Sequence, residues 1–416
     1  MEAPATSGPL GFDWEKTVAR GPMAAINALA TTDDGVLVAG AESRERGHSA
    51  PFVAAFDVYG RERYRVTLGQ PRSTTTPARG SAVAVAGTPT GDAYVLSTAA
   101  RVDGSGAVAL SLVDARGRVR FSTPIELSGA QPSLVVEPNG DVIVAGSLPA
   151  GQEFTVFKQS QAGARVWTQV YAVSGDTLRL LRLGRRLLLV GSLGGTAQFG
   201  AVRLARTEKV EFRCAGDPFP CEERALSLLV AELGPTGEPL RARLLGGPTS
   251  RLSVSDVALS GDGLLVTGEY EGPPVELGKV ALCELEPGMP EVAPQTFHEL
   301  GGGPHCSCRR DRRDLFLLAL DAEGEPRWAK ALAVGGSTPR VSVGARGEIR
   351  WGAEGARVAA ASGSMADGSG EVSLWSLDEA GAVSTRRGTP GNFTQMTAGP
   401  GAIYLSDRRV LRKTKW

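Results

Sequence analysis

The chain has 416 residues, and its 45 lysines and arginines balance its 45 aspartates and glutamates, so the formal net charge at pH 7 is zero. Nucleic-acid-binding proteins usually carry a basic stripe, so we expect no nucleic acid among the partners. Aromatic residues make up only 6% of the chain, glycine is abundant with 54 residues, and no apolar stretch approaches the roughly 20 residues of a transmembrane helix.

The N-terminal stretch, MEAPATSGPLGF, has neither the basic n-region nor the apolar h-region of a signal peptide. Its small polar residues resemble the stub that remains after export, and the cysteines described below favour the same interpretation. We expect an extracellular, periplasmic or outer-membrane-surface protein whose signal sequence lies outside these residues. A cytosolic protein is the alternative.

A short pattern recurs along the chain: an acidic residue, a glycine three positions later, and an aromatic residue four positions after the glycine. It occurs as FDVYGRERY at 56–64, VDARGRVRF at 113–121 and LDAEGEPRW at 320–328. The turn glycines are Gly60, Gly117, Gly163, Gly237, Gly324 and Gly381, and the residues four positions later are Tyr64, Phe121, Trp167, Arg241, Trp328 and Thr385. The pattern predicts a turn glycine followed by an aromatic residue that packs between neighbouring repeats.

Each repeat also contains a hairpin turn followed by a short apolar strand, such as DDGVLVAG at 33–40 and NGDVIVAG at 139–146. Glycine-containing dipeptides between apolar runs are typical of tight hairpins. The second repeat shows four strands, SAVAVA, DAYVLST, AVALSLVD and RVRFSTPI, between residues 81 and 125. Repeats of roughly 40–50 residues with four strands each indicate a β-propeller.

We therefore predict an all-β fold: a seven-bladed β-propeller of four-stranded blades, with residues 1–416 in a single domain. The first strands of the blades are expected near Ala24, Ser81, Gln131, Thr177, Leu252, Pro339 and Phe393. The last repeat ends at its third strand, RVLRKTKW, and an unassigned strand, FDWEKTVA, begins at Phe12. The N-terminal strand at 12–18 should pair with 408–415, complete the last blade and close the ring, which removes open strand edges.

Two insertions, 193–225 and 270–314, are predicted between the second and third strands of blades four and five. They are rich in proline, cysteine and charge, and equivalent loops of adjacent blades should form a recognition rim on one face. The candidate binding residues are Phe212, Phe219, Arg309, Arg310, Arg312 and Arg313. The alternatives are phenylalanines that cover a blade edge and arginines that form a solvated loop end.

All five cysteines fall in these insertions: Cys214, Cys221, Cys283, Cys306 and Cys308. Disulfides that staple long loops are the favoured interpretation, and they require an oxidising compartment. Two disulfides use four of the five cysteines, so one cysteine remains unpaired or pairs with another chain. The alternative is a zinc site made of His305, Cys306 and Cys308 with Cys283 or His298. Because its cysteines are separated by one residue, closer than usual for zinc, we expect no metal.

No catalytic residues are expected. The three histidines, His48, His298 and His305, lie in predicted loops, and no Gly-x-Ser-x-Gly elbow precedes a helix. Carboxylate pairs such as Asp33–Asp34 lie in turns. The Thr236–Gly237 pair has no following tryptophan, unlike the blades of quinoproteins, so no quinone or other cofactor is expected.

The combination LDAEGEPRWAK followed by the Gly-Gly end of ALAVGG resembles the SBBP-type propeller repeats of predicted surface lipoproteins from predatory, high-GC soil bacteria. The resemblance covers roughly residues 11–416, and it implies a propeller on the cell surface. It implies little about the ligand.

The expected function is that of a non-enzymatic, exported binding or scaffold propeller whose partner is a protein or a surface polysaccharide. One alternative is a propeller glycan hydrolase or lyase with its site at the central funnel. The mostly small, apolar first strands, such as SAVAVA, favour the scaffold over the enzyme. The other alternative is a structural subunit of a larger surface assembly.

The cysteine assignment predicts the result of mass mapping under non-reducing conditions. Cys214 should be joined to Cys221, and Cys283 to Cys306 or Cys308, in protein purified from an oxidising compartment. Five free thiols would contradict both the pairing and export, whereas one equivalent of bound zinc would favour the metal alternative.

Overall fold

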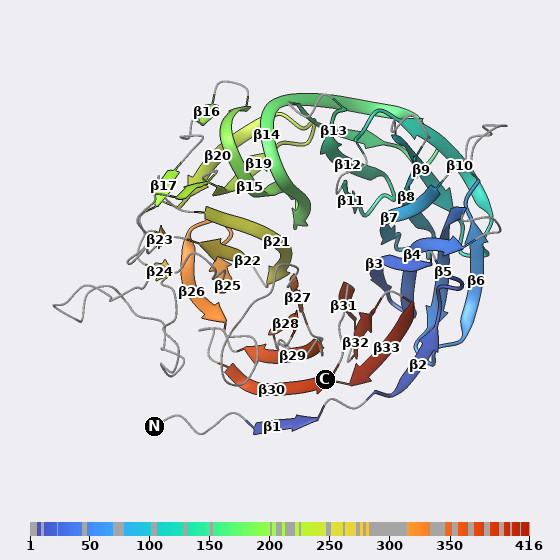
Figure 1. The fold of residues 1–416 in the computed structure, drawn as a ribbon. Coiled ribbons are helices and arrows are strands. Elements are labelled where there is room, and N and C mark those ends of the chain that lie inside the picture. Colours follow the sequence, from blue (N-terminus) through green and yellow to red (C-terminus); the bar gives the residue numbers. More distant parts are fainter. Residues whose placement is uncertain are drawn as a thin grey trace. The chain divides into compact units, whose positions relative to one another are not determined.

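Figure 1 shows the fold of the chain in a computed structural model. The described residues are 6–9, 12–22, 24–43, 48–69, 79–100, 106–128, 132–149, 153–199, 202–204, 210–212, 221–223, 226–246, 251–260, 263–271, 275–277, 280–282, 314–332, 346–351, 357–364, 370–377, 383–390, 395–399, 402–407 and 409–415. All regular structure in these segments is β-strand. The predicted all-β class is confirmed.

The chain divides into two compact parts, which we describe separately. The 11–171 part comprises Gly11–Tyr171, Gly352–Glu354 and Phe393–Trp416, and the 172–392 part comprises Met1–Leu10, Ala172–Trp351 and Gly355–Asn392. The single domain over 1–416 stays a prediction.

In the 11–171 part, the strands follow one another as antiparallel meanders of four, which we call blades. The strands of the first two blades are β3 (Ala25–Thr32), β4 (Gly35–Ser43), β5 (Ser49–Asp57), β6 (Glu62–Thr67), β7 (Arg79–Gly87), β8 (Ala93–Ala100), β9 (Gly106–Val113) and β10 (Val119–Ile125), joined in one eight-stranded sheet. The next blade consists of β11 (Ser133–Val136), β12 (Val142–Ser147), β13 (Phe154–Gln159) and the first half of β14 (Arg165–Leu183).

The N-terminal and C-terminal segments of the 11–171 part share one four-stranded sheet. Its strands, in order, are β2 (Trp14–Thr17), β33 (Val410–Lys415), β32 (Ala402–Ser406) and β31 (Gln395–Gly399). β2 and β33 are antiparallel, with Trp14 opposite Lys413 and Thr17 opposite Val410. The N-terminal strand therefore pairs with the C-terminal strand at the place that the sequence predicts.

In the 172–392 part, the second half of β14 continues into a blade with β15 (Arg186–Phe199), β19 (Ser227–Leu233) and β20 (Pro239–Leu245). The following sheets are β21 (Arg251–Ser260), β22 (Gly263–Glu271), β25 (Asp314–Leu320) and β26 (Pro326–Leu332), then β27 (Arg346–Trp351), β28 (Arg357–Ser364), β29 (Gly370–Leu377) and β30 (Val383–Pro390). The short strands are β1 (Thr6–Pro9), parallel to β30, β16 (Val202–Leu204) beside β15, and the pairs β17 (Val210–Phe212) with β18 (Cys221–Glu223) and β23 (Val275–Leu277) with β24 (Val280–Leu282).

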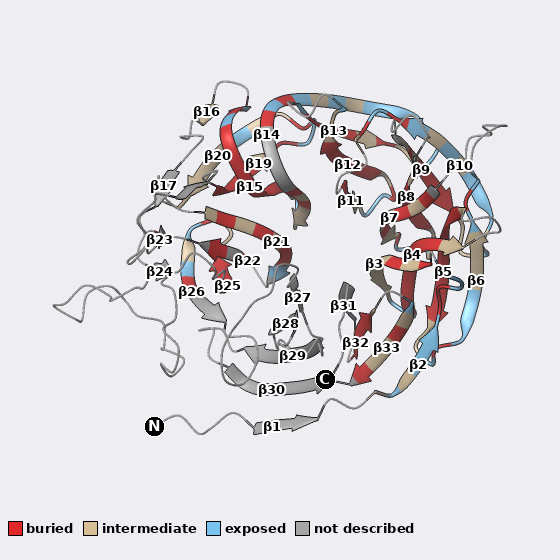
Figure 2. Cartoon of the chain, viewed as in Figure 1, coloured by how far each residue is buried: buried red, intermediate tan, exposed pale blue. Residues whose placement is uncertain are grey.

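The middle strands of a blade are mostly apolar because both of their faces are covered. In β4, the consecutive residues Val36, Leu37, Val38 and Ala39 are all buried. The fourth strand β10 instead alternates exposed and half-buried residues (Figure 2). Continuous apolar runs and alternating runs are the expected patterns for strands covered on two faces and on one face.

The recurrent sequence pattern forms the turn between the third and fourth strands of a blade. At 57–61, the N–H of Gly60 donates to the carbonyl of Asp57 at 3.0 Å, and Oδ1 of Asp57 accepts the N–H groups of Tyr59 and Arg61 at 2.9 and 2.8 Å. Gly60 has a φ of 77°, a value that glycine adopts without strain. Asp114 and Asp321 make the same contacts. The acidic residue thus stabilises the turn and the glycine supplies its backbone conformation.

The turn glycine has a second role, because an aromatic ring of the preceding blade lies directly against it. A Cβ atom on Gly60 would lie 2.9 Å from the ring of Trp14, and one on Gly117 would lie 2.9 Å from Tyr64. The Nε1–H of Trp14 also donates to the carbonyl of Val58, two residues before Gly60, at 3.2 Å. The expected packing of the aromatic residue between neighbouring blades is therefore present at these junctions.

Shortening Trp14 should destabilise the 11–171 part, because the residue covers Gly60 and lies on the strand that joins the two ends of the chain. We expect Trp14→Ala to lower the free energy of unfolding by about 2–3 kcal/mol and Trp14→Phe, which keeps a ring but loses the indole hydrogen bond, by about 1 kcal/mol. Urea unfolding of the full chain measures both. Tyr59→Ala, in the same turn but 74% exposed, is the control and should be near neutral. Equal midpoints for all variants would contradict this role of Trp14.

Candidate binding pocket beside Arg241

One blade of the 172–392 part carries a charged pair where the first two blades of the 11–171 part carry an apolar residue and a ring. On the third and fourth strands, Ala55 is opposite Tyr64 and Leu112 is opposite Phe121. At the same register of β19 and β20, Glu232 is opposite Arg241. The arginine therefore occupies the position from which those two blades project an aromatic ring.

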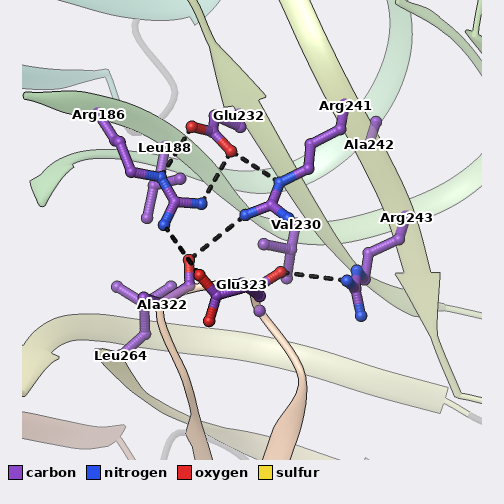
Figure 3. A pocket seen from close by; sticks show the side chains of 11 residues that line it. Arg186, Leu188, Val230, Glu232, Arg241, Ala242, Arg243, Leu264, Ala322 and Glu323 are labelled. Atoms are coloured by element: carbon purple, nitrogen blue, oxygen red, sulfur yellow. Dashed lines mark hydrogen bonds and ion pairs between the residues drawn. The ribbon is translucent and has the colours of Figure 1, made fainter. Parts of the chain in front are cut away.

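Glu232 is held by two arginines (Figure 3). Arg186, the first residue of β15, donates through Nε and Nη2 to Oε1 and Oε2 of Glu232 at 2.7 and 2.8 Å. Arg241 donates through Nε to Oε2 at 2.7 Å. The planar guanidinium of Arg186 thus makes a bidentate pair with the carboxylate, the geometry that fixes both groups best.

Arg241 and its neighbour Arg243 also reach the turn of the next blade. Nη2 of Arg241 lies 3.5 Å from the carbonyl of Ala322, and Nη2 of Arg243 donates to the carbonyl of Glu323 at 3.1 Å. Ala322 lies two residues before Gly324, as Val58 lies two residues before Gly60. The guanidinium of Arg241 consequently approaches the same turn carbonyl that the indole of Trp14 binds at the other junction.

A pocket of about 160 Å³ lies beside these groups. It is lined by Arg186, Leu188, Val230, Glu232, Arg241, Ala242, Arg243, Leu264, Ala322, Glu323 and Gly324. Leu188, Val230 and Leu264 are buried and supply apolar surface. Charged groups on an apolar base, with their geometry set by mutual ion pairs, are suited to bind a polar ligand of small size.

The arginines keep Glu232 ionised. Hydrogen bonds from Arg186 and the charges of Arg186 and Arg241 lower the pKa of Glu232, although partial burial opposes the change. The hydrogen bond to Glu232 correspondingly raises the pKa of Arg186. A general acid needs a carboxyl pKa that is raised rather than lowered, so Glu232 can accept hydrogen bonds from a ligand but is not suited to protonate one.

The pocket lies at the opposite end of its strands from the first predicted insertion. Arg186 begins β15 and Glu232 lies near the end of β19, whereas β15 ends at Phe199 and β19 begins at Ser227. The sequence identified Arg241 as an exception to the aromatic pattern, but no binding role was predicted for it. Arg186 and Glu232 carry no sequence signal of their own, because only the register of three strands brings them together.

The predicted site residues fall largely outside the described residues. Phe212 and Cys221 are backbone partners in the short ladder of β17 and β18. The others, Phe219, Cys214, Cys283, Cys306, Cys308, Arg309, Arg310, Arg312 and Arg313, lie outside the described residues, as do His298 and His305. The disulfides, the zinc alternative and the recognition rim therefore stay predictions.

Two further findings apply to the described part of the chain alone. Within it, no three side chains of histidine, cysteine, aspartate or glutamate are grouped closely enough to hold a metal ion. The same residues include no helix with the length and apolarity that a membrane span needs.

The chain matches no protein-family model and no curated protein. Among solved structures it is similar to an α-L-arabinanase of Penicillium chrysogenum complexed with arabinobiose, with a TM-score of 0.45 and 13% identity over 80% of this chain and 92% of the other. It is also similar to the β-propeller domain of the Trilobed protease from Pyrococcus furiosus (TM-score 0.35, 9% identity, 85% and 95%). An exo-β-1,3-galactanase from Clostridium thermocellum gives a TM-score of 0.35 at 9% identity over 93% and 82%. The resemblance to SBBP repeats stays a prediction.

Removing the charge of Glu232 should destabilise the protein, because Arg186 and Arg241 would then lie close together without a counter-ion. We expect Glu232→Gln to lower the free energy of unfolding at pH 7 by about 1–2 kcal/mol. The control Glu325→Gln, which breaks the pair of Arg243 with a 59% exposed carboxylate, should change it by less than about 0.5 kcal/mol because exposed ion pairs contribute little.

The effect of Glu232→Gln should depend on pH. Because the pKa of Glu232 is lower in the folded state, the advantage of the wild type is fully present above the unfolded value of about 4.3 and is lost as the pH falls through the folded value. Chemical unfolding of both proteins at several pH values between 7 and 3 measures this difference. A difference that stays constant down to pH 3 would contradict the ion-pair origin of the stability.

Proposed function

We propose that the chain forms a seven-bladed β-propeller in one domain, with β2 as the fourth strand of the last blade. Three observations support the proposal: the pairing of β2 with β33, the repeated four-strand meander, and the repeated contact of a ring with the turn glycine of the next blade. In such a ring β2 covers the edge of β33 and gives the last blade its fourth strand, so β33 is protected from pairing with other chains.

We further propose that this propeller is exported and binds a glycan through the Arg241 pocket. The observation that carries the proposal is the arrangement of ionised Glu232 between Arg186 and Arg241 above buried Leu188 and Val230. Sugar hydroxyl groups both donate and accept hydrogen bonds, and sugar rings also have apolar C–H faces. Fixed acceptors and donors beside an apolar surface match both properties.

Hydrolysis of a glycan at the central funnel is the second candidate. The arabinanase and the galactanase among the similar structures agree better with this candidate than with a non-enzymatic protein. The lowered pKa of Glu232 argues against hydrolysis in the Arg241 pocket itself, because a glycosidase needs one protonated carboxyl group beside the bond that it cleaves.

A glycan array followed by an assay for released reducing ends separates the two candidates. We expect the purified full chain to bind glycans on the array. It should release no new reducing ends when it is incubated with the glycans that it binds. Release of reducing ends would favour the hydrolase, and a chain that retains no glycan and cleaves none would contradict both.

The binding surface itself is tested by shortening the predicted insertions, 193–225 and 270–314, to tight turns. Because the Arg241 pocket lies at the other end of the strands, we expect glycan binding to persist in the shortened protein. Loss of binding, with the far-UV circular dichroism unchanged, would instead favour the recognition rim of Phe212, Phe219, Arg309, Arg310, Arg312 and Arg313.

A further inference from the structure

The Arg241 pocket lies where another junction holds a six-membered ring. At that junction Tyr64 lies against Gly117, and its nearest ring atom is 3.1 Å from a Cβ placed there. At Gly324, the nearest side chain is instead that of Val230, at 3.0 Å from such a Cβ. The turn has the same form, since the φ angles of Gly117 and Gly324 are 80° and 79°. The site therefore keeps the backbone surface on which a ring packs but has an arginine in place of the ring.

The size of the pocket agrees with a ring-shaped occupant. Its volume is about 160 Å³, and an apolar cavity of about 150 Å³ is sufficient to bind benzene. The apolar surface of Leu188, Val230 and Leu264 can contact one face of such a ring. An unsubstituted aromatic ring would leave Glu232 and the arginines without new hydrogen bonds, whereas a ring with several hydroxyl groups would engage them.

The charges around the pocket indicate an anionic substituent on this ring. Three arginines and two glutamates line it, and Arg186 and Arg241 donate three hydrogen bonds to Glu232, which leaves about one of the four acceptor sites of its carboxylate for a ligand. Within the described residues, Nη1 of Arg241 has no bonding partner, and the side chain is 42% exposed. Arg243 lies two residues further along β20; its Nη1 pairs with Glu325 and its Nη2 donates to the carbonyl of Glu323, whereas its Nε is unbonded within the same residues. These N–H groups are available to a carboxylate.

We propose that the Arg241 pocket binds a uronic acid residue, so that the glycan recognised by this protein is an acidic polysaccharide. The sugar ring packs on Val230 and Leu264, Glu232 accepts from ring hydroxyl groups, and the carboxylate pairs with Arg241 and Arg243. This inference rests on the proposed glycan-binding function and specifies the class of sugar.

The test uses the full chain with two probes, an oligosaccharide of galacturonic acid and the matching neutral oligosaccharide of galactose, titrated by calorimetry. We expect the wild type to bind the acidic probe at least about tenfold more tightly, the difference expected from one or two charge-assisted hydrogen bonds. The preference should decrease as salt is raised, because the arginines are partly exposed.

Arg241→Trp is the decisive variant, because it restores the ring that other blades place at this position and fills the pocket. It should unfold at a thermal midpoint no lower than that of Arg241→Gln. Its affinity for the acidic probe should be at least about tenfold lower than that of the wild type, the change expected when a charge-assisted hydrogen bond is removed. Arg120→Trp, a matched change on the fourth strand β10 at a 52% exposed arginine, should bind as the wild type does.

The outcomes separate the inference from the proposed function. Equal binding of both probes, or unchanged binding of the acidic probe by Arg241→Trp, would overturn the uronic acid site and leave glycan binding in place. Binding of neither probe by a wild type that retains other glycans on the array would also overturn the site alone. A wild type that retains no glycan at all would overturn both.

Discussion

The contact between a turn glycine and a ring of the preceding blade is the constraint on which the described structure depends. The glycine must accept a positive φ near 80°, and at the same time it must leave room for a ring that would clash with any Cβ. Trp14 against Gly60 and Tyr64 against Gly117 show the two demands together. At these two positions glycine is therefore favoured for two independent reasons, and the ring packs directly on the turn of the next blade.

The identity of the residue four positions after the turn glycine consequently decides whether a junction is filled. A ring there closes the space above the next turn with apolar surface and needs no partner. An arginine, as at Arg241, brings a charge that cannot be buried without a counter-ion. Glu232 and Arg186 supply the compensation from two further strands, and the remaining space is the pocket. At this junction three charged residues from three strands thus replace a ring, and a pocket lies beside them.

Much of the fold could be predicted from the sequence because turns and strands are local. The acidic residue and glycine of LDAEGEPRW specify their turn within five residues, and strands begin within a few residues of Ala24, Ser81 and Leu252. The continuous strand β14 could not be predicted in the same way. It passes from one blade to the next over 19 residues without a proline to mark the boundary, and only its two partners, β13 and β15, distinguish its halves.

The candidate site could be predicted only in part, and a comparison of two blades shows why. In the blade of β11 to β14, Lys158 pairs with Asp141 at 3.1 Å. These two residues occupy the same positions in their blade as Glu232 and Arg186 do in theirs, but the signs of the charges are exchanged. The residue opposite Lys158 on the fourth strand is Trp167, a ring. An ion pair at this position can therefore coexist with an aromatic residue on the fourth strand. What distinguishes the Arg241 pocket is the loss of the ring, which the sequence shows, combined with a carboxylate across the strand, which only the register of β19 and β20 reveals.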